Sequence, residues 1–585
     1  MRVAALICAL GSFACSSHKG GDDSSGSATL VLSPPTSTLV LQDGAPATEP
    51  FTATLMTADG SAVDVTAQAL FGVDEELGSF VGSTLTMSSA GLGTVTALYM
   101  DEDSDTFIGS AQVVADLTGV RIDPSLGSGT PDLFGSGATE DPTRVPTVVY
   151  PPAGVIVPRN LGDFEVHWTD ASSNNVWEVS LQGTYVDLKV YVPGGNGAGG
   201  GPDPSWMSFL PDEWLSAVGN SEAMTYQVRG ADSTMPGSVG SAPPESADLS
   251  NEAMNGGIYY WSTGGTGSDG EGIWRHDMSK PQTPATAFYT GAQLTNPTQG
   301  ACIACHVLSV DGTKMAVTFQ GGNGSADEID VATQALQNNT NYWNFATYTP
   351  DGSQLLAVEA GDLVVRDQAT QTVVGSMTSA GWVTHPSLSA DGTMLVYTRP
   401  TVMNCDWAFG GGEIVTRTYD QASASFGTET VLLQNSMNNY YPSFSPDGQW
   451  ILFNQSSDNS TTGAYNNPSA TVWVIKADGT QPPVALSAMN TSTANLTNSW
   501  PRWAPFQQTV GQSSTPIYWI TMSSKRDFGV RLVGKAQPQL WMSPFFPGQA
   551  AMGIDPSAPA FWLPFQNIDS SNHIAQWTQQ VIGLQ

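Results

Sequence analysis

The sequence predicts an all-β protein in which two β-sandwich domains precede a six-bladed β-propeller. Charged residues make up only 12% of the 585 residues, whereas 61 Gly and 38 Pro favour turn-rich structure. Short runs of alternating hydrophobic residues recur through the first half of the chain, as expected for half-buried strands. In the second half an Asp-Gly turn followed by a hydrophobic strand recurs about every forty residues, which is typical of propeller blades with four strands each.

The first 27 residues have the pattern of an export signal followed by a tether. Arg2 precedes a short apolar run over residues 3–14, which cannot span a bilayer. A small polar stretch follows Cys15 and resembles the start of mature bacterial lipoproteins, although Ser12 stands where that family usually has Leu. The resemblance implies a signal peptide at 1–14, lipidation of Cys15 and a tether at 15–27.

An ordinary signal peptide with an incidental cysteine is the alternative. In either case the remaining chain is expected to be exported and soluble, because no other stretch reaches transmembrane length. The lipoprotein resemblance implies an outer-membrane, periplasmic or cell-surface protein of a Gram-negative bacterium, with the lipid as its only membrane contact. Nucleic acid is excluded as a partner by 53 acidic against 19 basic residues, a formal net charge of −34.

Residues 28–117 are predicted to form the first sandwich. Their last predicted strand, Gly91–Ala97, resembles the end of bacterial Ig-like repeats, which implies a spacer or adhesive module. Residues 118–145 are rich in Gly, Ser, Pro, Asp and Thr and are predicted to be a linker. The second sandwich, at 146–250, resembles a fibronectin type III domain with Trp168 in its core, and His167 is expected to face outward.

Residues 251–585 are predicted to be the propeller. Its repeats resemble the TolB-type propeller family, whose blades carry a Pro-x-x-Ser-Pro-Asp-Gly turn; residues 442–448 match this turn closely. Counting a degenerate copy at 500–505 and an earlier strand pair gives six blades, with ring closure by pairing of strands near 258 and 540. A short C-terminal helix is expected from residue 570, with four apolar residues on one face: Ile574, Trp577, Val581 and Ile582.

The chemistry is predicted to lie at residues 302–306. Cys302, Cys305 and His306 form a C-x-x-C-H sequence, which is the attachment motif of c-type haem. The two thiols form thioethers to the porphyrin, and the histidine is the proximal iron ligand. This chemistry requires a compartment outside the cytoplasm, as the signal peptide independently implies.

The sixth iron ligand is expected from another blade. His385 is the first choice because it starts an aligned repeat; the reserves are Met403, Met437 and His573, whereas His276 is expected at the surface. The leading hypothesis is therefore a haem c propeller for electron transfer or redox sensing, with an unidentified redox or envelope protein as its partner.

Two other interpretations of the cysteines remain open. Cys302 and Cys305 could form a disulfide in a non-enzymatic binding scaffold, or they could bind zinc together with His306 and Cys405. The sequence has no G-x-S-x-G, H-E-x-x-H or P-loop motif, so an electron carrier or scaffold is favoured over an enzyme.

Overall fold

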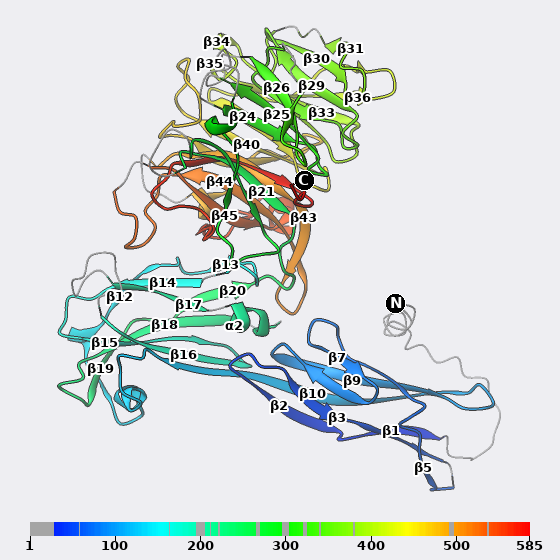
Figure 1. Cartoon of the computed structure of the whole chain (residues 1–585), viewed down its shortest axis with the longest axis vertical. Coiled ribbons are helices and arrows are strands. Elements are labelled where there is room, and N and C mark those ends of the chain that lie inside the picture. Colours follow the sequence, from blue (N-terminus) through cyan, green and yellow to red (C-terminus); the bar gives the residue numbers. More distant parts are fainter. Residues whose placement is uncertain are drawn as a thin grey trace. The chain divides into compact units, whose positions relative to one another are not determined.

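The computed structural model describes residues 28–584 apart from positions 58, 163, 195–204, 211, 220–222, 265–269, 295–302, 320–324, 338–340, 378, 380, 491–495 and 535–536. The predicted signal and tether, including Cys15, and the motif residue Cys302 lie outside the described residues. Strands dominate the structure (Figure 1). None of the helices in the described segments has the length and apolarity needed to span a bilayer.

The chain divides into two compact units. Unit 1 comprises Met1–Pro146, Ala171–Gly194 and Phe209–Ser246. Its elements are β1 (Thr29–Ser33), β2 (Thr36–Gln42), β3 (Ala47–Pro50), β4 (Thr52–Met56), β5 (Ala62–Asp64), β6 (Leu70–Gly72), β7 (Gly78–Val81), β8 (Thr84–Met87), β9 (Gly91–Met100), β10 (Thr106–Ile122), η1 (Thr130–Phe134), β11 (Thr139–Glu140), η2 (Pro142–Arg144), β15 (Val176–Gln182), β16 (Val186–Pro193), α2 (Asp212–Ala217), β18 (Met224–Ala231) and β19 (Ser238–Ser241).

Unit 1 is built on a long sheet in the order β11-β19-β18-β15-β16-β10-β9-β6, with two smaller sheets, β1-β4-β5 and β3-β8-β7. Strand β10 alternates buried and exposed side chains, so that Val113 and Ala115 enter the core. The same strand continues past residue 117 and pairs in parallel with β16, so the predicted linker at 118–145 begins inside a strand. Phe134, within that segment, is buried against Tyr191.

Unit 2 comprises Thr147–Asp170, Gly195–Ser208 and Ala247–Gln585. Before the propeller it contains β12 (Thr147–Tyr150), β13 (Val155–Val157) and β14 (Phe164–Thr169); β17 (Ser205–Leu210) and β20 (Glu245–Leu249) lie at its borders. Trp168 is buried, as predicted. His167 is also fully buried, which corrects the expectation that it faces outward: Nε2 contacts Glu165 at 2.8 Å, and Phe528 covers the ring.

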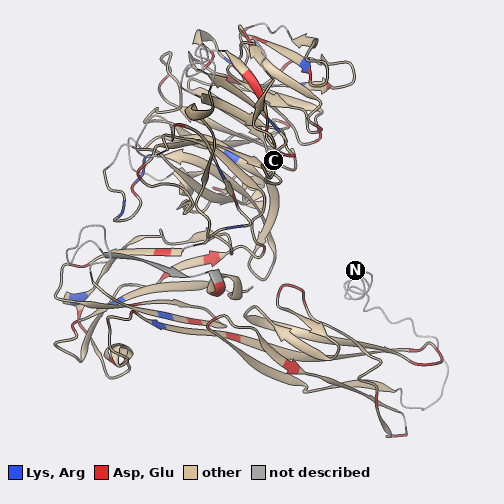
Figure 2. Cartoon of the chain, in the orientation of Figure 1, with Lys and Arg blue, Asp and Glu red and all other residues tan. Residues whose placement is uncertain are grey.

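The propeller has six blades, which confirms the predicted count. The sheets of blades 1 to 3 are β47-β21-β22-β23, β24-β25-β26-β27 and β28-β29-β30-β31; those of blades 4 to 6 are β32-β33-β36-β37 with β38, β39-β40-β41-β42 and β43-β44-β45-β46. Most of the ribbon carries neither charge sign, in keeping with the low content of charged residues (Figure 2).

The strands of blades 1 to 3 are β21 (Gly257–Ser262), β22 (Gly272–Asp277), β23 (Thr286–Thr290), β24 (Ile303–Leu308), β25 (Lys314–Phe319), β26 (Ala326–Asp330), β27 (Ala335–Leu336), β28 (Ala346–Tyr348), β29 (Gln354–Glu359), β30 (Asp362–Asp367) and β31 (Val373–Met377). Those of blade 4 and its hairpin are β32 (Thr384–Leu388), β33 (Met394–Arg399), β34 (Val402–Cys405), β35 (Ala408–Gly410), β36 (Glu413–Asp420), β37 (Ser425–Phe426) and β38 (Thr430–Leu433).

Blades 5 and 6 contain β39 (Asn438–Phe444), β40 (Trp450–Ser456), β41 (Thr471–Lys476), β42 (Val484–Ala485), β43 (Asn498–Val510), β44 (Thr515–Ser524), β45 (Gln539–Phe545) and β46 (Phe561–Trp562). The last strand of the chain is β47 (Asn572–Thr578), and the short helices of the region are η4 (Gly291–Gln293), α3 (Ser487–Asn490) and α4 (Pro547–Ala551).

The Asp-Gly turns account for the repeat. In blade 5 the carboxylate of Asp447 accepts hydrogen bonds from the Ser445 hydroxyl and the Gln449 amide. Gly448 follows with φ at +69°, a left-handed conformation that glycine adopts without strain. The turn therefore aims each innermost strand back into the second strand of its blade.

The C-terminal segment differs from the prediction. It forms strand β47 rather than a helix, and it pairs with β21 as the innermost strand of blade 1. The segment near 540 instead belongs to β45, the third strand of blade 6. The seven residues of β47 are all buried, so no alternation marks the strand, and the spacing of Ile574 and Trp577 mimics a helix face.

His276 is a second correction. It was expected at the surface but is buried in β22, with its ring stacked on Phe565 at a centroid distance of 4.2 Å. Phe565 is nearly 300 residues away in the sequence. The residues next to His276 therefore could not predict that Phe565 buries it.

Candidate functional site

One residue from each blade lines the centre of the propeller. These six residues, which we call the channel ring, are Cys305, Phe345, His385, Tyr441, Trp500 and Ile574. In the four regular repeats the ring residue lies six positions before the Asp of the Asp-Gly turn. Neighbouring aromatic side chains of the channel ring are in contact. The ring centroids of His385 and Tyr441 are 4.3 Å apart, and those of Tyr441 and Trp500 are 4.1 Å apart.

Strand bulges set the direction of the ring residues. The pairing of the innermost strand with its neighbour shifts at each bulge, and four ring residues there have φ near +50°. They are His385, Tyr441, Trp500 and Ile574. A bulge re-aims a side chain out of the normal alternation, and here it directs one side chain per blade into the channel.

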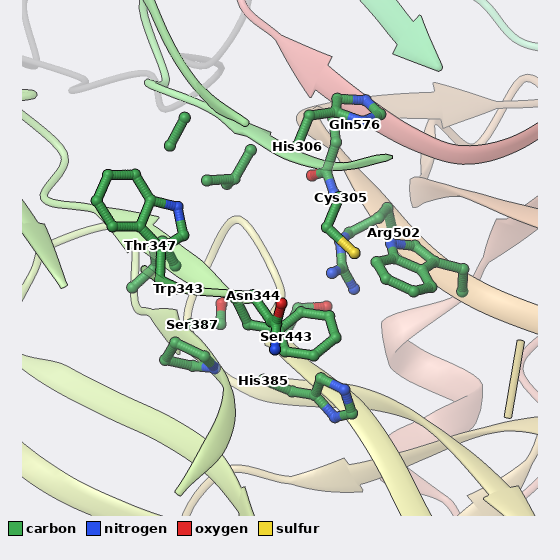
Figure 3. A pocket seen from close by; sticks show the side chains of 16 residues that line it. Cys305, His306, Trp343, Asn344, Thr347, His385, Ser387, Ser443, Arg502 and Gln576 are labelled. Atoms are coloured by element: carbon green, nitrogen blue, oxygen red, sulfur yellow. The ribbon is translucent and has the colours of Figure 1, made fainter. Parts of the chain in front are cut away.

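Two cavities share the channel ring. The larger has a volume of about 580 Å³ and is lined mainly by aromatic side chains: Trp261, Phe345, Trp407, Tyr441, Tyr465 and Trp500. The smaller, of about 140 Å³, is more polar than the larger, and its lining includes Asn344, His385, Ser387, Ser443 and Arg502 (Figure 3). Cys305 borders both cavities.

The two described residues of the C-x-x-C-H motif face different surroundings. Cys305 packs against the apolar cluster of the channel, and its sulfur is directed into the cavity (Figure 3). His306 is buried toward blade 1, where Nε2 lies 3.3 Å from the carbonyl oxygen of Tyr259 and Nδ1 lies 3.4 Å from that of Ala304. Burial lowers the pKa of His306 to about 4, so the imidazole is neutral at pH 7.

His385 lies in the channel, as its place in the repeat predicted. It is buried, and its Nδ1 accepts a hydrogen bond of 3.3 Å from the Tyr441 amide. Its Nε2 has no hydrogen-bond partner in the described part of the chain. Because Nδ1 accepts, the proton of the neutral ring is on Nε2, which makes this atom a donor rather than a lone pair for iron. Burial, with a smaller contribution from Arg502, holds its pKa well below the usual value.

Arg502 was not predicted to be a site residue. It follows Pro501 in the degenerate repeat, where the sister blades have Ser387 and Ser443. Its guanidinium lies beside the Cys305 sulfur in Figure 3 and donates to the carbonyl oxygen of Pro501 at 3.0 Å. Burial lowers its pKa to about 10, which leaves it cationic at neutral pH. An arginine in place of a repeat serine was the available sequence signal.

The other predicted ligands are dispersed. Met403 packs against the channel cluster, whereas Met437 lines neither cavity. Cys405 is a free thiol on β34, and the described residues contain no group of three or more His, Cys, Asp or Glu that could hold a metal. Cys305, His306 and Cys405 are therefore not brought together. His573 is buried against Tyr465 at a centroid distance of 4.3 Å, and burial lowers its pKa to about 3.

The larger cavity fits a c-type haem in its thiol and its volume, but the histidine of the motif lines only the smaller cavity. Cys305 borders an aromatic cavity whose 580 Å³ is within the roughly 300–1,000 Å³ typical of pockets for organic ligands. His306 is neutral, the form in which imidazole binds metals. To face the cavity, its ring must give up two long contacts to carbonyl oxygens, each worth about 1 kcal/mol.

Comparisons with known proteins give structural likeness only. TolB from Acinetobacter baumannii has 14% sequence identity and a TM-score of 0.36, covering 61% of this chain and 80% of that chain. A putative TolB from Agrobacterium tumefaciens has 14% identity and a TM-score of 0.30, covering 56% and 99%. Kuenenia stuttgartiensis hydrazine synthase has 15% identity and a TM-score of 0.25, covering 41% and 80%.

No protein-family model and no curated protein matches the sequence. All three scores are below 0.5, so the blade count and the channel described above rest on the strand pairing itself.

Proposed function

We propose that the propeller carries one covalently attached haem c in its larger channel cavity and acts in electron transfer or redox sensing. The observation that carries this proposal is the position of Cys305 on the wall of an aromatic cavity of about 580 Å³. The thiol belongs to a C-x-x-C-H motif, and the cavity offers the flat apolar surfaces that a porphyrin needs.

The residues have separate tasks in this proposal. Cys302 and Cys305 hold the porphyrin, and His306 is the proximal ligand once its ring leaves the carbonyl oxygens of Tyr259 and Ala304. That cost of about 2 kcal/mol in total is small beside the binding energy of a metal centre. Bound haem supplies a one-electron couple, and the aromatic lining keeps water from the group.

The proposal includes the location of the protein. Thioether formation takes place outside the cytoplasm, where the predicted signal peptide would deliver the chain. Lipidation of Cys15 would tether the mature protein to an envelope membrane by its N-terminus. A tethered electron carrier or sensor would meet envelope proteins rather than soluble metabolites.

The test is production of the full chain with its signal sequence in a bacterium that matures c-type cytochromes. We expect red protein, haem that stays attached under denaturing conditions, and a haem c pyridine haemochrome spectrum. Cys302→Ala and Cys305→Ala should each weaken covalent attachment, and the double variant should abolish it. Cys405→Ala is the matched control, because it removes a thiol outside the motif and should retain full haem content.

The alternatives predict different products. A colourless protein with a Cys302–Cys305 disulfide in its mass spectrum would disprove haem attachment and support the binding-scaffold interpretation. One zinc per chain, lost in Cys405→Ser, would support the Cys₃His site instead.

A further inference from the structure

The smaller channel cavity brings together three hydrogen-bond donors with unmet bonding capacity. Arg502, His385 and Ser443 all line it (Figure 3). His385 Nε2 and Ser443 Oγ are buried and have no hydrogen-bond partner among the described residues. The same holds for Trp500 Nε1, which also lines this cavity. Buried polar atoms are satisfied in nearly all native proteins, so unpaired atoms on one cavity wall favour a bound ligand there.

Arg502 also has hydrogen-bond donors without a partner in the described chain, and its side chain is positively charged. Within the described residues it donates one hydrogen bond, to the Pro501 carbonyl, and its guanidinium carbon lies 5.6 Å from the centroid of the Trp500 ring. No carboxylate of the described residues pairs with it. Arg526 provides a comparison within the same propeller, since its guanidinium is bonded to Ser524, Asn498 and the Met489 carbonyl. A largely desolvated cation with spare donors is costly unless an anion completes it.

The residues that line the smaller cavity favour a negatively charged ligand. None of the residues lining the smaller cavity is Asp or Glu, so Arg502 gives the wall a net positive charge in a protein of net charge −34. His385 adds an Nε2–H donor because its Nδ1 is occupied by the Tyr441 amide. Hydrogen-bond donors on the wall of one cavity are complementary to the oxygens of an anion.

The volume limits the size of that anion. A cavity of about 140 Å³ holds four or five groups of the size of a water molecule, at about 30 Å³ each. Acetate, nitrate and nitrite have three or four heavy atoms and are of this size.

We infer that the smaller cavity is a binding site for one small oxyanion, such as a carboxylate or nitrate, held by the guanidinium of Arg502, the Nε2–H of His385 and the hydroxyl of Ser443. This inference does not rest on the haem proposal, because the three donors line the cavity without it. If haem is present, a porphyrin propionate has the same chemistry, and the experiment separates the two sources.

The test is calorimetric titration of acetate and nitrate into the full chain produced without haem, in a chloride-free buffer. We expect one saturable site per chain. Arg502→Gln should weaken binding tenfold or more, whereas Arg502→Lys, which keeps the charge, should stay within a few-fold of the parent. Arg366→Gln is the matched control: it removes one positive charge at an ion pair with Glu359, away from the channel, and should leave binding unchanged.

Thermal melting of each variant establishes that it is folded. If Arg502→Gln does not fold, Ser443→Ala takes its place and should weaken binding several-fold through loss of one donor. Repeating the titration with the haem-bearing chain identifies the occupant: lost binding means that a propionate fills the site, and retained binding means a free anion. No saturable binding by the haem-free parent, or equal binding by a folded Arg502→Gln, would overturn the inference.

Discussion

The propeller unit should lose stability steeply between pH 7.5 and pH 5.5. All five histidines of the described chain are buried, and burial lowers the pKa of each of them: His167, His276, His306, His385 and His573. The pKa falls to about 4 in His276 and His306 and to about 3 in His573. In the unfolded chain each titrates near pH 6.5, so unfolding takes up protons below that pH.

The magnitude follows from the unfolded state alone while the folded histidines stay neutral. Protonation of one unfolded histidine favours unfolding by about 1.4 kcal/mol more at pH 5.5 than at pH 7.5. Five sites together give about 7 kcal/mol, which is comparable with the whole stability of many proteins. Glu328 and Asp406, whose pKa values are raised by burial, act in the opposite direction. Two such carboxyl groups cannot offset five histidines.

The assay is urea denaturation of the haem-free chain, followed by tryptophan fluorescence at pH 7.5, 6.5 and 5.5. We expect the midpoint to fall at each step, mostly below pH 6.5. His276→Phe should reduce the pH dependence by about one fifth, because the aromatic ring keeps the stack on Phe565 and removes one titrating site. A midpoint that is constant from pH 7.5 to 5.5 would refute the reasoning, since it would mean that the folded histidines also take up protons.

Three further predictions concern the fold. Deleting residues 572–585 removes the innermost strand of blade 1, so circular dichroism should show no cooperative melting of the propeller; melting like that of the full chain would contradict the closure. Asp447→Ala removes the acceptor of a blade turn and should cost about 1–2 kcal/mol in urea titrations, and an unchanged midpoint would count against the turn's role. Arg526→Leu leaves buried acceptors unpaired and should cost about 3 kcal/mol or more, whereas Arg366→Leu at a more exposed ion pair should cost under about 1 kcal/mol; equal losses would be inconsistent with this difference.

The blade count was predictable because its signal is local. Each Asp-Gly turn satisfies its own hydrogen bonds within a few residues, so the pattern survives in the sequence even where the strands diverge. Strand β47 was not predictable in the same way. It is buried on both faces, and a short, fully buried strand has no alternation to distinguish it from a helix.

The burial of the histidines also could not be predicted from the local sequence. Alternation along β14 predicted an outward His167, and a strand end predicted an exposed His276. Phe528 packs on His167 and Phe565 packs on His276, and both phenylalanines are far from these histidines in the sequence. The neighbouring residues in sequence therefore do not indicate the burial. Arg502 was missed because it lies in the most degenerate repeat, although its alignment with Ser443 places it in the channel.

The closing strand also fixes the order of events during synthesis. Strand β21 is made more than 300 residues before β47, its partner on the inner edge of blade 1. Until the last residues appear, that edge has unpaired backbone groups and could capture a strand from another chain. Blade 1 is therefore completed only after the other five blades have been made. The ring stays open until β47 is present, and a chain released before β47 is made is prone to aggregate.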